Sequence, residues 1–175
     1  MKLRVPLFFL FIFCWAACKN KPAITAKQYS DEVLRMQQSL AEPIRQAENE
    51  IKAFGDSANY SGMAGAAGKM ESLIQGKIDT LNKIDAASFQ GGADFKTVVI
   101  RYFEYLKSVY SSYKEIGNAA NGVERLKATD DMYQKLSAQQ DVEERMRTSQ
   151  TRFAALNGFM FTEPDLAQPD SSSNR

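Results

Sequence analysis

Two pairs of adjacent carboxylates are the side chains of this sequence with the most obvious potential for chemistry. They are Asp130-Asp131 and Glu143-Glu144, and carboxylates can bind a divalent cation or move a proton. Adjacent residues of a helix point about 100° apart, so neither pair converges on one ion by itself. Asp130-Asp131 is better explained as a helix start stabilised through the helix dipole. We therefore expect no metal site and no cofactor.

The residue types that the chain lacks also argue against catalysis. The sequence contains no histidine, and its two cysteines, Cys14 and Cys18, both lie near the N-terminus. Ser-His-Asp triads, Cys-His pairs and zinc sites built on His or Cys therefore have no ligands or bases here. We expect the protein not to be an enzyme.

Several polar groups on apolar helix faces admit two interpretations. The tyrosines at 102, 105, 110 and 113 could line a hydroxyl-bearing pocket, or they could fill the edge of a core with their hydroxyls in water. The second interpretation is favoured because two of the four lie on a regular apolar seam. Gln139 could bind a ligand, but a polar residue on such a seam more often fixes helix register.

The first eighteen residues indicate where the protein acts. A charged start is followed by the apolar run Val5–Phe13 and then by Ala16-Ala17-Cys18, which is the pattern of a secretory signal. The apolar run is too short to span a bilayer, which needs about 20 residues. Ala16-Ala17-Cys18 resembles the lipobox of bacterial lipoproteins, in which the signal is cut before a cysteine that carries the lipid. We expect residues 1–17 to be a signal peptide and Cys18 to be lipidated.

The residues after Cys18 suggest a location within the envelope. An aspartate directly after the lipidated cysteine would resemble an inner-membrane retention signal. This chain has Lys19 at that position, so we expect the outer membrane. The basic Lys19-Asn20-Lys21 differs from the acidic tethers of some surface lipoproteins, which favours the periplasmic face over the alternative, the cell surface. With 22 basic and 21 acidic residues the chain has a formal net charge of +1, which argues against nucleic acid as a partner.

Four long stretches carry apolar residues at steps of three and four, the pattern of amphipathic helices. Thr25 and Gln28 form a capping box that should start the first helix at Ala26. The seams run over residues 29–54, 63–84, 95–116 and 132–156. No stretch is typical of a strand. The pattern predicts an all-α domain at 25–161, arranged as an up-down-up-down antiparallel four-helix bundle with left-handed packing.

The last two seams differ in quality. The third is an unbroken heptad repeat, so we expect its helix to be the most buried, with Leu106 in mid-seam and Ser112 outside it. The fourth is interrupted by Gln139 and Ser149, so its helix, running to Asn157, should be the most loosely held. Residues 18–24 should form a lipidated tether, and the Pro- and Ser-rich residues 162–175 predict a disordered tail.

The order of several motifs resembles that of a known group of proteins. The motifs are the lipobox, Phe54-Gly55-Asp56, Phe95-Lys96, Tyr102-Phe103-Glu104-Tyr105, Tyr113-Lys114-Glu115-Ile116 and Phe153-Ala154. Together they resemble a family of small bacterial lipoproteins known only as surface proteins of unknown function. The resemblance implies an all-helical lipoprotein, and it supplies no catalytic or ligand-binding residues.

Two functional hypotheses remain. The first is a non-enzymatic envelope lipoprotein, held on the membrane by the lipid on Cys18, with a structural role or a role in binding an unknown envelope protein. Its candidate partner surface is the charged run that contains Glu143, Glu144, Arg145 and Arg147, which could equally be a solvated face. The alternative is a carrier that holds a small molecule or lipid in a cavity among Met and Tyr side chains.

Overall fold

A computed structural model describes residues 24–161, and every regular element in that range is an α-helix. The predicted signal peptide, Cys18, most of the tether and the tail at 162–175 lie outside the described residues. The helices are α1 (Ala26–Asp56), α2 (Tyr60–Asn82), α3 (Gly92–Asn118), α4 (Gly122–Leu136) and α5 (Gln139–Leu156). The predicted all-α class is thus confirmed for this part of the chain.

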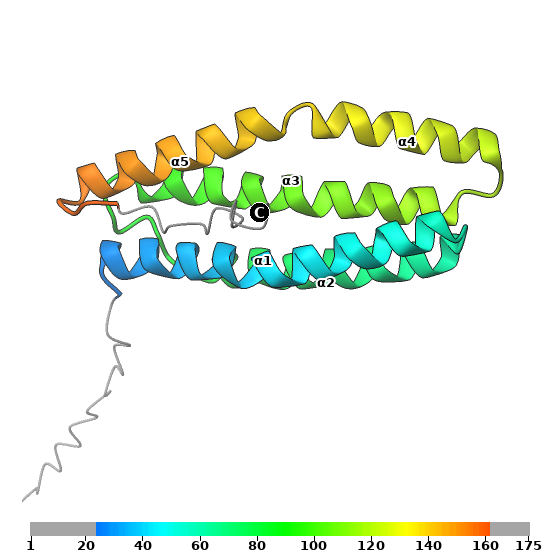
Figure 1. The fold of residues 1–175 in the computed structure, drawn as a ribbon. Helices are drawn as coiled ribbons and strands as arrows, with labels where there is room; N and C mark the ends of the chain where they lie inside the picture. The colour runs from blue at the N-terminus through cyan, green and yellow to red at the C-terminus, as the bar shows by residue number, and fades with distance from the viewer. Residues whose placement is uncertain (1–23, 162–175) are drawn as a thin grey trace, which may run out of the picture.

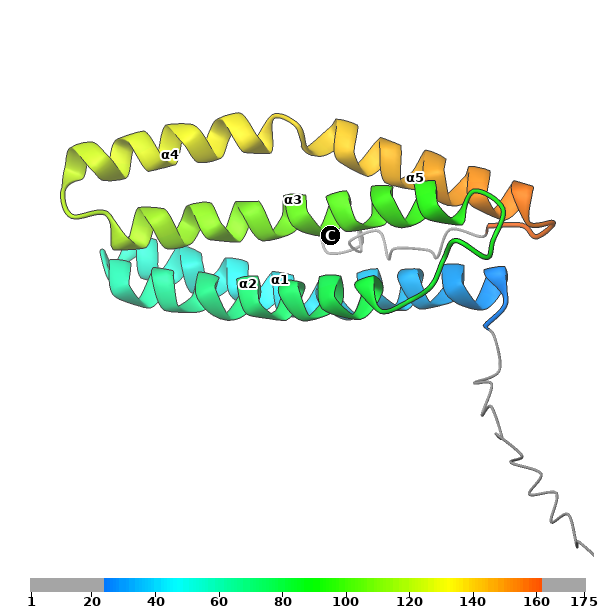
Figure 2. The same cartoon turned by 180° about the vertical axis from the view of Figure 1, so that it is seen from behind.

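The helices pack side by side as a bundle in which α4 and α5 follow one another along the length of α3 (Figures 1 and 2). These two helices occupy the place of the single fourth helix that the sequence predicts, so four helical segments pack against each other. Helix α3 lies against α1, α2, α4 and α5, although α1 packs mainly against α2.

The first two helices follow their apolar seams closely. The Gln28 amide N–H donates to the Thr25 hydroxyl at 3.1 Å, and the Gln28 side chain accepts from the Thr25 N–H at 2.8 Å, so the capping box forms as predicted. Six of the eight seam residues of α1 and six of the seven of α2 are buried: Tyr29, Val33, Met36, Leu40, Ala47 and Ile51, with Met63, Ala67, Met70, Ile74, Ile78 and Leu81.

Aromatic rings join three helices at one end of the bundle. Phe95 of α3 stacks on Phe153 of α5 with ring centroids 4.6 Å apart, and Tyr29 of α1 meets these rings edge-on at 5.6 and 5.8 Å. All three side chains are buried. Gly158 (φ 73°) then reverses the chain in a Schellman ending, and Phe159 packs on Phe153.

Close backbone contact and a cation–π contact join the helices at the other end. A Cβ on Gly117 of α3 would lie 2.5 Å from the Tyr60 carbonyl oxygen of α2, so only glycine allows this approach. The Arg125 guanidinium of α4 lies 3.6 Å from the centre of the Tyr60 ring, and its Nη2 donates to the Ala119 carbonyl at 3.1 Å. Glycine and arginine thus tie α2, α3 and α4 together.

The expected face of α3 is only partly correct. Leu106 is half-buried, whereas Phe103 and Tyr110, which flank the seam, are buried, and Ser112 has 0 % of its surface exposed. Helix α3 buries seven residues, the same number as the shorter α2, so it is not the most buried helix. Because helices pack on several sides of α3, no single heptad stripe describes its core.

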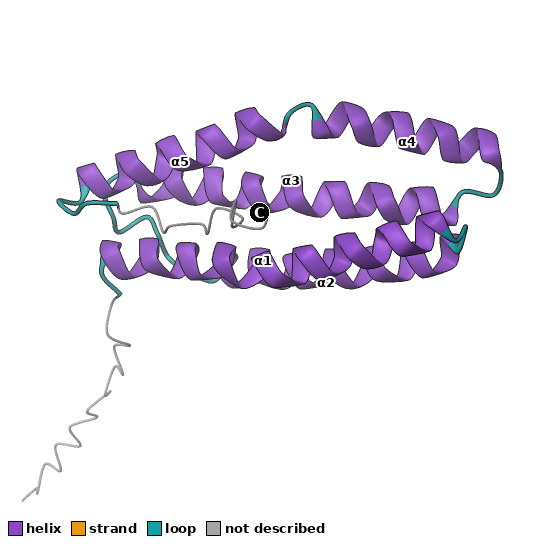
Figure 3. Cartoon of the chain, in the orientation of Figure 1, coloured by secondary structure: helices purple, strands orange, loops and turns teal. Residues whose placement is uncertain are grey.

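The predicted single fourth helix is also wrong, since it breaks at Ser137 and Ala138 (Figure 3). The expected seam continues from Leu136 through Gln139 and Val142 to Met146, but Gln139 is exposed and Val142 is only half-buried. The Gln139 side chain donates to the Glu143 carboxylate at 2.8 Å instead of fixing helix register. No fully buried apolar residue between Leu136 and Met146 holds the chain to the bundle, so the helix ends.

Gly117→Ala should lower the free energy of unfolding by about 1–3 kcal/mol, because the new methyl group would clash with the α2 backbone. Gly65→Ala is the matched control, since a Cβ at this exposed helical position meets nothing within 4 Å. It should raise the free energy of unfolding by about 0.5–1 kcal/mol through helix propensity. Urea denaturation followed by circular dichroism measures both. Equal effects of the two substitutions would contradict the close approach.

Candidate functional site

The candidate partner residues all lie on α5, and they are divided between two open hollows. Glu144 and Arg145 line a groove between α5 and α3, whereas Glu143 and Arg147 line a hollow toward α1, in which Glu144 also takes part. All four are exposed. The sequence predicts one charged surface at these residues, and the structure divides them between two sides of α5. Cys18 lies outside the described residues.

The division follows from the helical positions of α5. Met146, Gln150 and Phe153, at steps of four and three, are buried against the bundle. The next row around the helix, Val142, Arg145, Ser149 and Arg152, repeats the same spacing and lines the groove toward α3. In a closed helix pair this row would be apolar, and here it contains two arginines and a serine.

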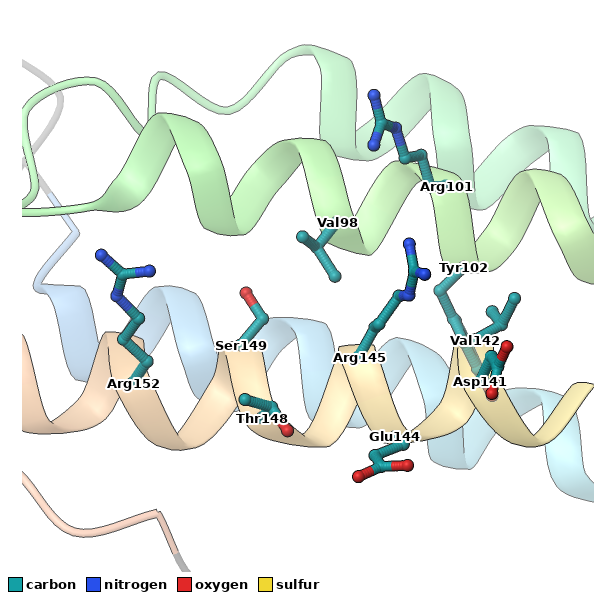
Figure 4. Close-up of a pocket in the computed structure, with 10 residues that line it drawn as sticks. All are labelled: Val98, Arg101, Tyr102, Asp141, Val142, Glu144, Arg145, Thr148, Ser149 and Arg152. Atoms are coloured by element: carbon teal, nitrogen blue, oxygen red, sulfur yellow. The ribbon is translucent and has the colours of Figure 1, made fainter.

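The groove between α3 and α5, called the α3–α5 groove below, has a volume of about 550 Å³. Val98 and Tyr102 of α3 and Val142 of α5 form its apolar part (Figure 4). Arg145 and Arg152 extend from α5 toward α3 in this view, with the Ser149 hydroxyl between them. Arg101 stands on the α3 side with its guanidinium turned away from α5.

The arginines of this groove have no ion pair within residues 24–161. No described carboxylate lies within 4.0 Å of Arg101, Arg145 or Arg152, whereas Arg35 and Arg45 on α1 each bind a glutamate three residues away. Asp141 stands four residues before Arg145, the favourable order for a helical ion pair, yet the pair does not form. The charge of the groove is thus available to a ligand.

Tyr102 borders both hollows. Its ring is half-buried, and burial raises the pKa of its hydroxyl, although a hydrogen bond with the Gln37 side chain acts in the opposite direction. Gln37 of α1 in turn accepts a hydrogen bond from the buried Gln150 of α5 at 2.7 Å. Tyr102 therefore stays a neutral hydrogen-bonding group at ordinary pH, in a polar contact between α1 and α5.

The four tyrosines of α3 do not come together as a pocket. Of the four, only Tyr102 lines the α3–α5 groove. Tyr110 is buried, with a hydroxyl pKa raised by that burial, and Tyr113 lies beside it at a centroid distance of 6.3 Å. The Tyr105 hydroxyl is buried without a hydrogen-bond partner in the described part of the chain. The expectation that all these hydroxyls reach water is therefore wrong for Tyr105.

A serine and a lysine form a contact that resembles a catalytic pair. The Lys135 ammonium of α4 donates to the Ser112 hydroxyl of α3 at 2.7 Å, and that hydroxyl donates to the Ser108 carbonyl at 3.1 Å. A nucleophilic serine must reach its substrate, and Ser112 is completely buried. The pair therefore fastens α4 to α3 and performs no chemistry.

Neither of the two acidic pairs, Asp130-Asp131 and Glu143-Glu144, forms a site for a cation. Asp131 binds Lys127 at 2.7 Å, and Glu143 accepts from Gln139. Among the residues that the structure describes, no group of three or more acidic, His or Cys side chains could hold a metal ion. None of the described helices has the length and apolar character needed to cross a membrane.

Comparison of the chain with family models, with curated proteins and with solved structures found no match in any of the three.

Sequence reasoning missed the residues that complete the groove, namely Val98, Arg101 and Arg152. The row 142-145-149-152 carries the helical spacing of a buried seam, and arginine at two of its positions is the signal that could have found the site. Val98 and Arg101 could not have been found this way, because they come from another helix.

Ser112→Ala should lower the free energy of unfolding by about 1–3 kcal/mol, because it leaves the half-buried Lys135 ammonium without its acceptor. Ser72→Ala removes an equivalent hydroxyl-to-carbonyl hydrogen bond on the exposed face of α2, and its effect should stay within about 0.5 kcal/mol. Chemical denaturation measures both values. Labelling of Ser112 by a serine-directed fluorophosphonate in the folded protein would show instead that it is an accessible nucleophile.

Proposed function

We propose that this chain is a lipid-anchored protein of the bacterial cell envelope whose helical domain binds another envelope protein and catalyses no reaction. The observation that carries the proposal is the state of α5. Glu143, Glu144, Arg145 and Arg147 are exposed on it, and none has an ion pair within the described range. Exposed charges without an internal partner are suited to steering and specificity in association.

A second surface supports a binding role. Val123, Leu126 and Tyr133 of α4 lie at steps of three and seven, so they share one helix face. They are 81 %, 64 % and 63 % exposed. The inward face of the same helix carries Arg125 and Lys135, which bind α2 and α3 through polar contacts. Apolar side chains on the outward face of such a helix are typical of an interaction surface.

The proposed location rests on the N-terminal sequence. Residues 1–17 are the signal peptide in this proposal, Cys18 carries the lipid, and the protein is held on the outer membrane, on its periplasmic face in preference to the cell surface. The near-balanced charge of the chain speaks against nucleic acid as a partner. No metal or cofactor is part of the proposal.

The proposed arrangement of the domain is an up-down-up-down antiparallel bundle with left-handed packing. Contacts between helix ends support the alternating directions. Tyr29, near the start of α1, meets Phe153, near the end of α5. Gly117, near the end of α3, approaches Tyr60 at the start of α2.

The alternative, a carrier with a cavity among Met and Tyr side chains, has less support. Met63, Met70 and Met146 are buried in the packed core. The α3–α5 groove is open at the surface, and no methionine lines it, so it is not the predicted cavity among Met and Tyr side chains. We therefore prefer the interaction role.

Reversing the four charges of α5 should weaken partner capture and leave the fold intact. The variant is Glu143→Arg, Glu144→Arg, Arg145→Glu and Arg147→Glu, measured by cross-linking in cells and recovery from solubilised membranes. Each partner-facing charge contributes through complementarity, so the loss should be about tenfold or more.

The matched control reverses four charges on α1: Glu42→Arg, Arg45→Glu, Lys52→Glu and Asp56→Lys. These residues form two exposed ion pairs with one another, so the exchange keeps both pairs and the net charge. Capture by the control should equal that of the wild type. Equal capture by both variants would move the interface away from α5, and turnover in an activity screen would overturn the non-enzymatic role.

Cys18→Ala should stop lipid attachment and release the protein from the membrane fraction, because each buried CH₂ of an acyl chain contributes about 0.8 kcal/mol to anchoring. Mass spectrometry of the wild-type N-terminal peptide measures the attached lipid, and fractionation measures the release. An unlipidated but normally processed wild type would refute the anchor. Protease treatment of intact cells decides the face, since digestion places the protein outside.

A further inference from the structure

We propose that the α3–α5 groove binds a small anionic amphiphile, a molecule with a carboxylate or phosphate head and a short apolar chain. This site shares Glu144 and Arg145 with the partner surface proposed above, but it does not depend on that proposal. The proposal rests on three features of the groove: the helical row that faces it, the state of its arginines and the position of its apolar side chains.

The helical row is the first argument. Val142, Arg145, Ser149 and Arg152 occupy positions at which α5 would normally present apolar side chains to α3. Apolar residues there would close the space between the helices. Instead, a groove of about 550 Å³ remains, which is within the range of small-molecule sites. The polar row keeps a space open that an ordinary helix pair fills.

The arginines are the second argument. A guanidinium presents a planar fork of donors that matches a carboxylate or phosphate. Arg145 and Arg152 are seven residues apart, about 10 Å along the helix axis, and the Ser149 hydroxyl lies between them (Figure 4). Arg145 leaves Asp141 unbound, although the spacing of the two favours a helical ion pair. This part of the groove therefore suits an anionic head.

The apolar side chains are the third argument. Val98, the ring of Tyr102 and Val142 line the groove beside these donors. Asp141 lies one turn before Arg145, toward the start of α5, where it would repel a second anionic group, whereas Glu144 is turned away from α3 (Figure 4). The occupant therefore has one anionic head near Arg145 and Arg152, and its apolar chain lies against Val98, Tyr102 and Val142.

The experiment is calorimetric titration of protein spanning residues 18–175, with Cys18→Ala so that no attached lipid competes. The probes are octanoate and octyl phosphate below their micelle concentrations, with neutral octyl glucoside and inorganic phosphate as references. Both octyl anions should bind about tenfold or more tightly than either reference, because only they offer both head and chain. The stronger of the two identifies the head, carboxylate or phosphate.

Arg145→Gln with Arg152→Gln should weaken binding of the octyl anion by about tenfold or more. Arg147→Gln is the control for the loss of a single charge, because it neutralises one arginine on the α1 side of α5, and it should change affinity less than about twofold. Circular dichroism verifies that each variant is folded. Arg145→Lys with Arg152→Lys should retain part of the affinity, because lysine keeps the positive charge but lacks the planar pair of donors of the guanidinium.

Three outcomes would overturn the proposal: no heat of binding with either octyl anion, binding of octyl glucoside as tight as that of the anions, or an equal loss in the Arg147 control. Binding of a peptide of residues 162–175, which contains Glu163, Asp165 and Asp170, to protein spanning residues 18–161, with no binding of the octyl anions, would assign the groove to the chain's own C-terminal segment instead. Arg145 belongs to both surfaces, but binding of the octyl anions and capture of a partner are separate measurements on the wild-type protein, so either proposal can fail alone.

Discussion

Contact with α3 is the constraint on which the rest of this structure depends. Helix α3 lies against all four other helices, so its surface must meet a different neighbour on each side. Small residues make this possible at two points. Gly117 admits the α2 backbone, and Ser112 is small enough to be buried under α4 while its hydroxyl accepts from Lys135. Larger side chains at these positions would push α2 or α4 away.

The sequence predicted the buried residues best for helices that bury a single face and worst for α3, which buries several. The seams of α1 and α2 were predicted almost residue by residue, because one amphipathic stripe describes each of them. The α3 pattern misplaced Leu106 and Ser112, because a heptad count identifies one face and this helix buries several. The break after Leu136 was signalled only by Gln139 on the expected seam, and a polar residue there is compatible with either a loose helix or two shorter ones.

The candidate site was predictable as a stretch of charge and not as a geometry. The sequence shows that residues 143–147 are charged, and helical spacing separates Glu143 and Arg147 from Arg145. Which side meets α3 and which meets α1 depends on the rotation of α5, and that rotation is set by the burial of Phe153 against Phe95 and Tyr29. Val98 and Arg145 line the same groove only because tertiary packing brings α3 and α5 together.

The contacts that hold α4 and α5 to the bundle lie on either side of residues 137–145, and this explains how a polar stretch between them is tolerated. Aromatic stacking holds the end of α5, and the Arg125 and Lys135 contacts hold α4. Between them, residues 137–145 bury no side chain, so that stretch contributes little to the core. Apolar replacement of Arg145, Ser149 and Arg152 would extend burial along α3 and stabilise the domain by the area removed from water. A sequence selected for stability alone would carry such residues, and the polar row that is present instead is the feature that a binding role accounts for.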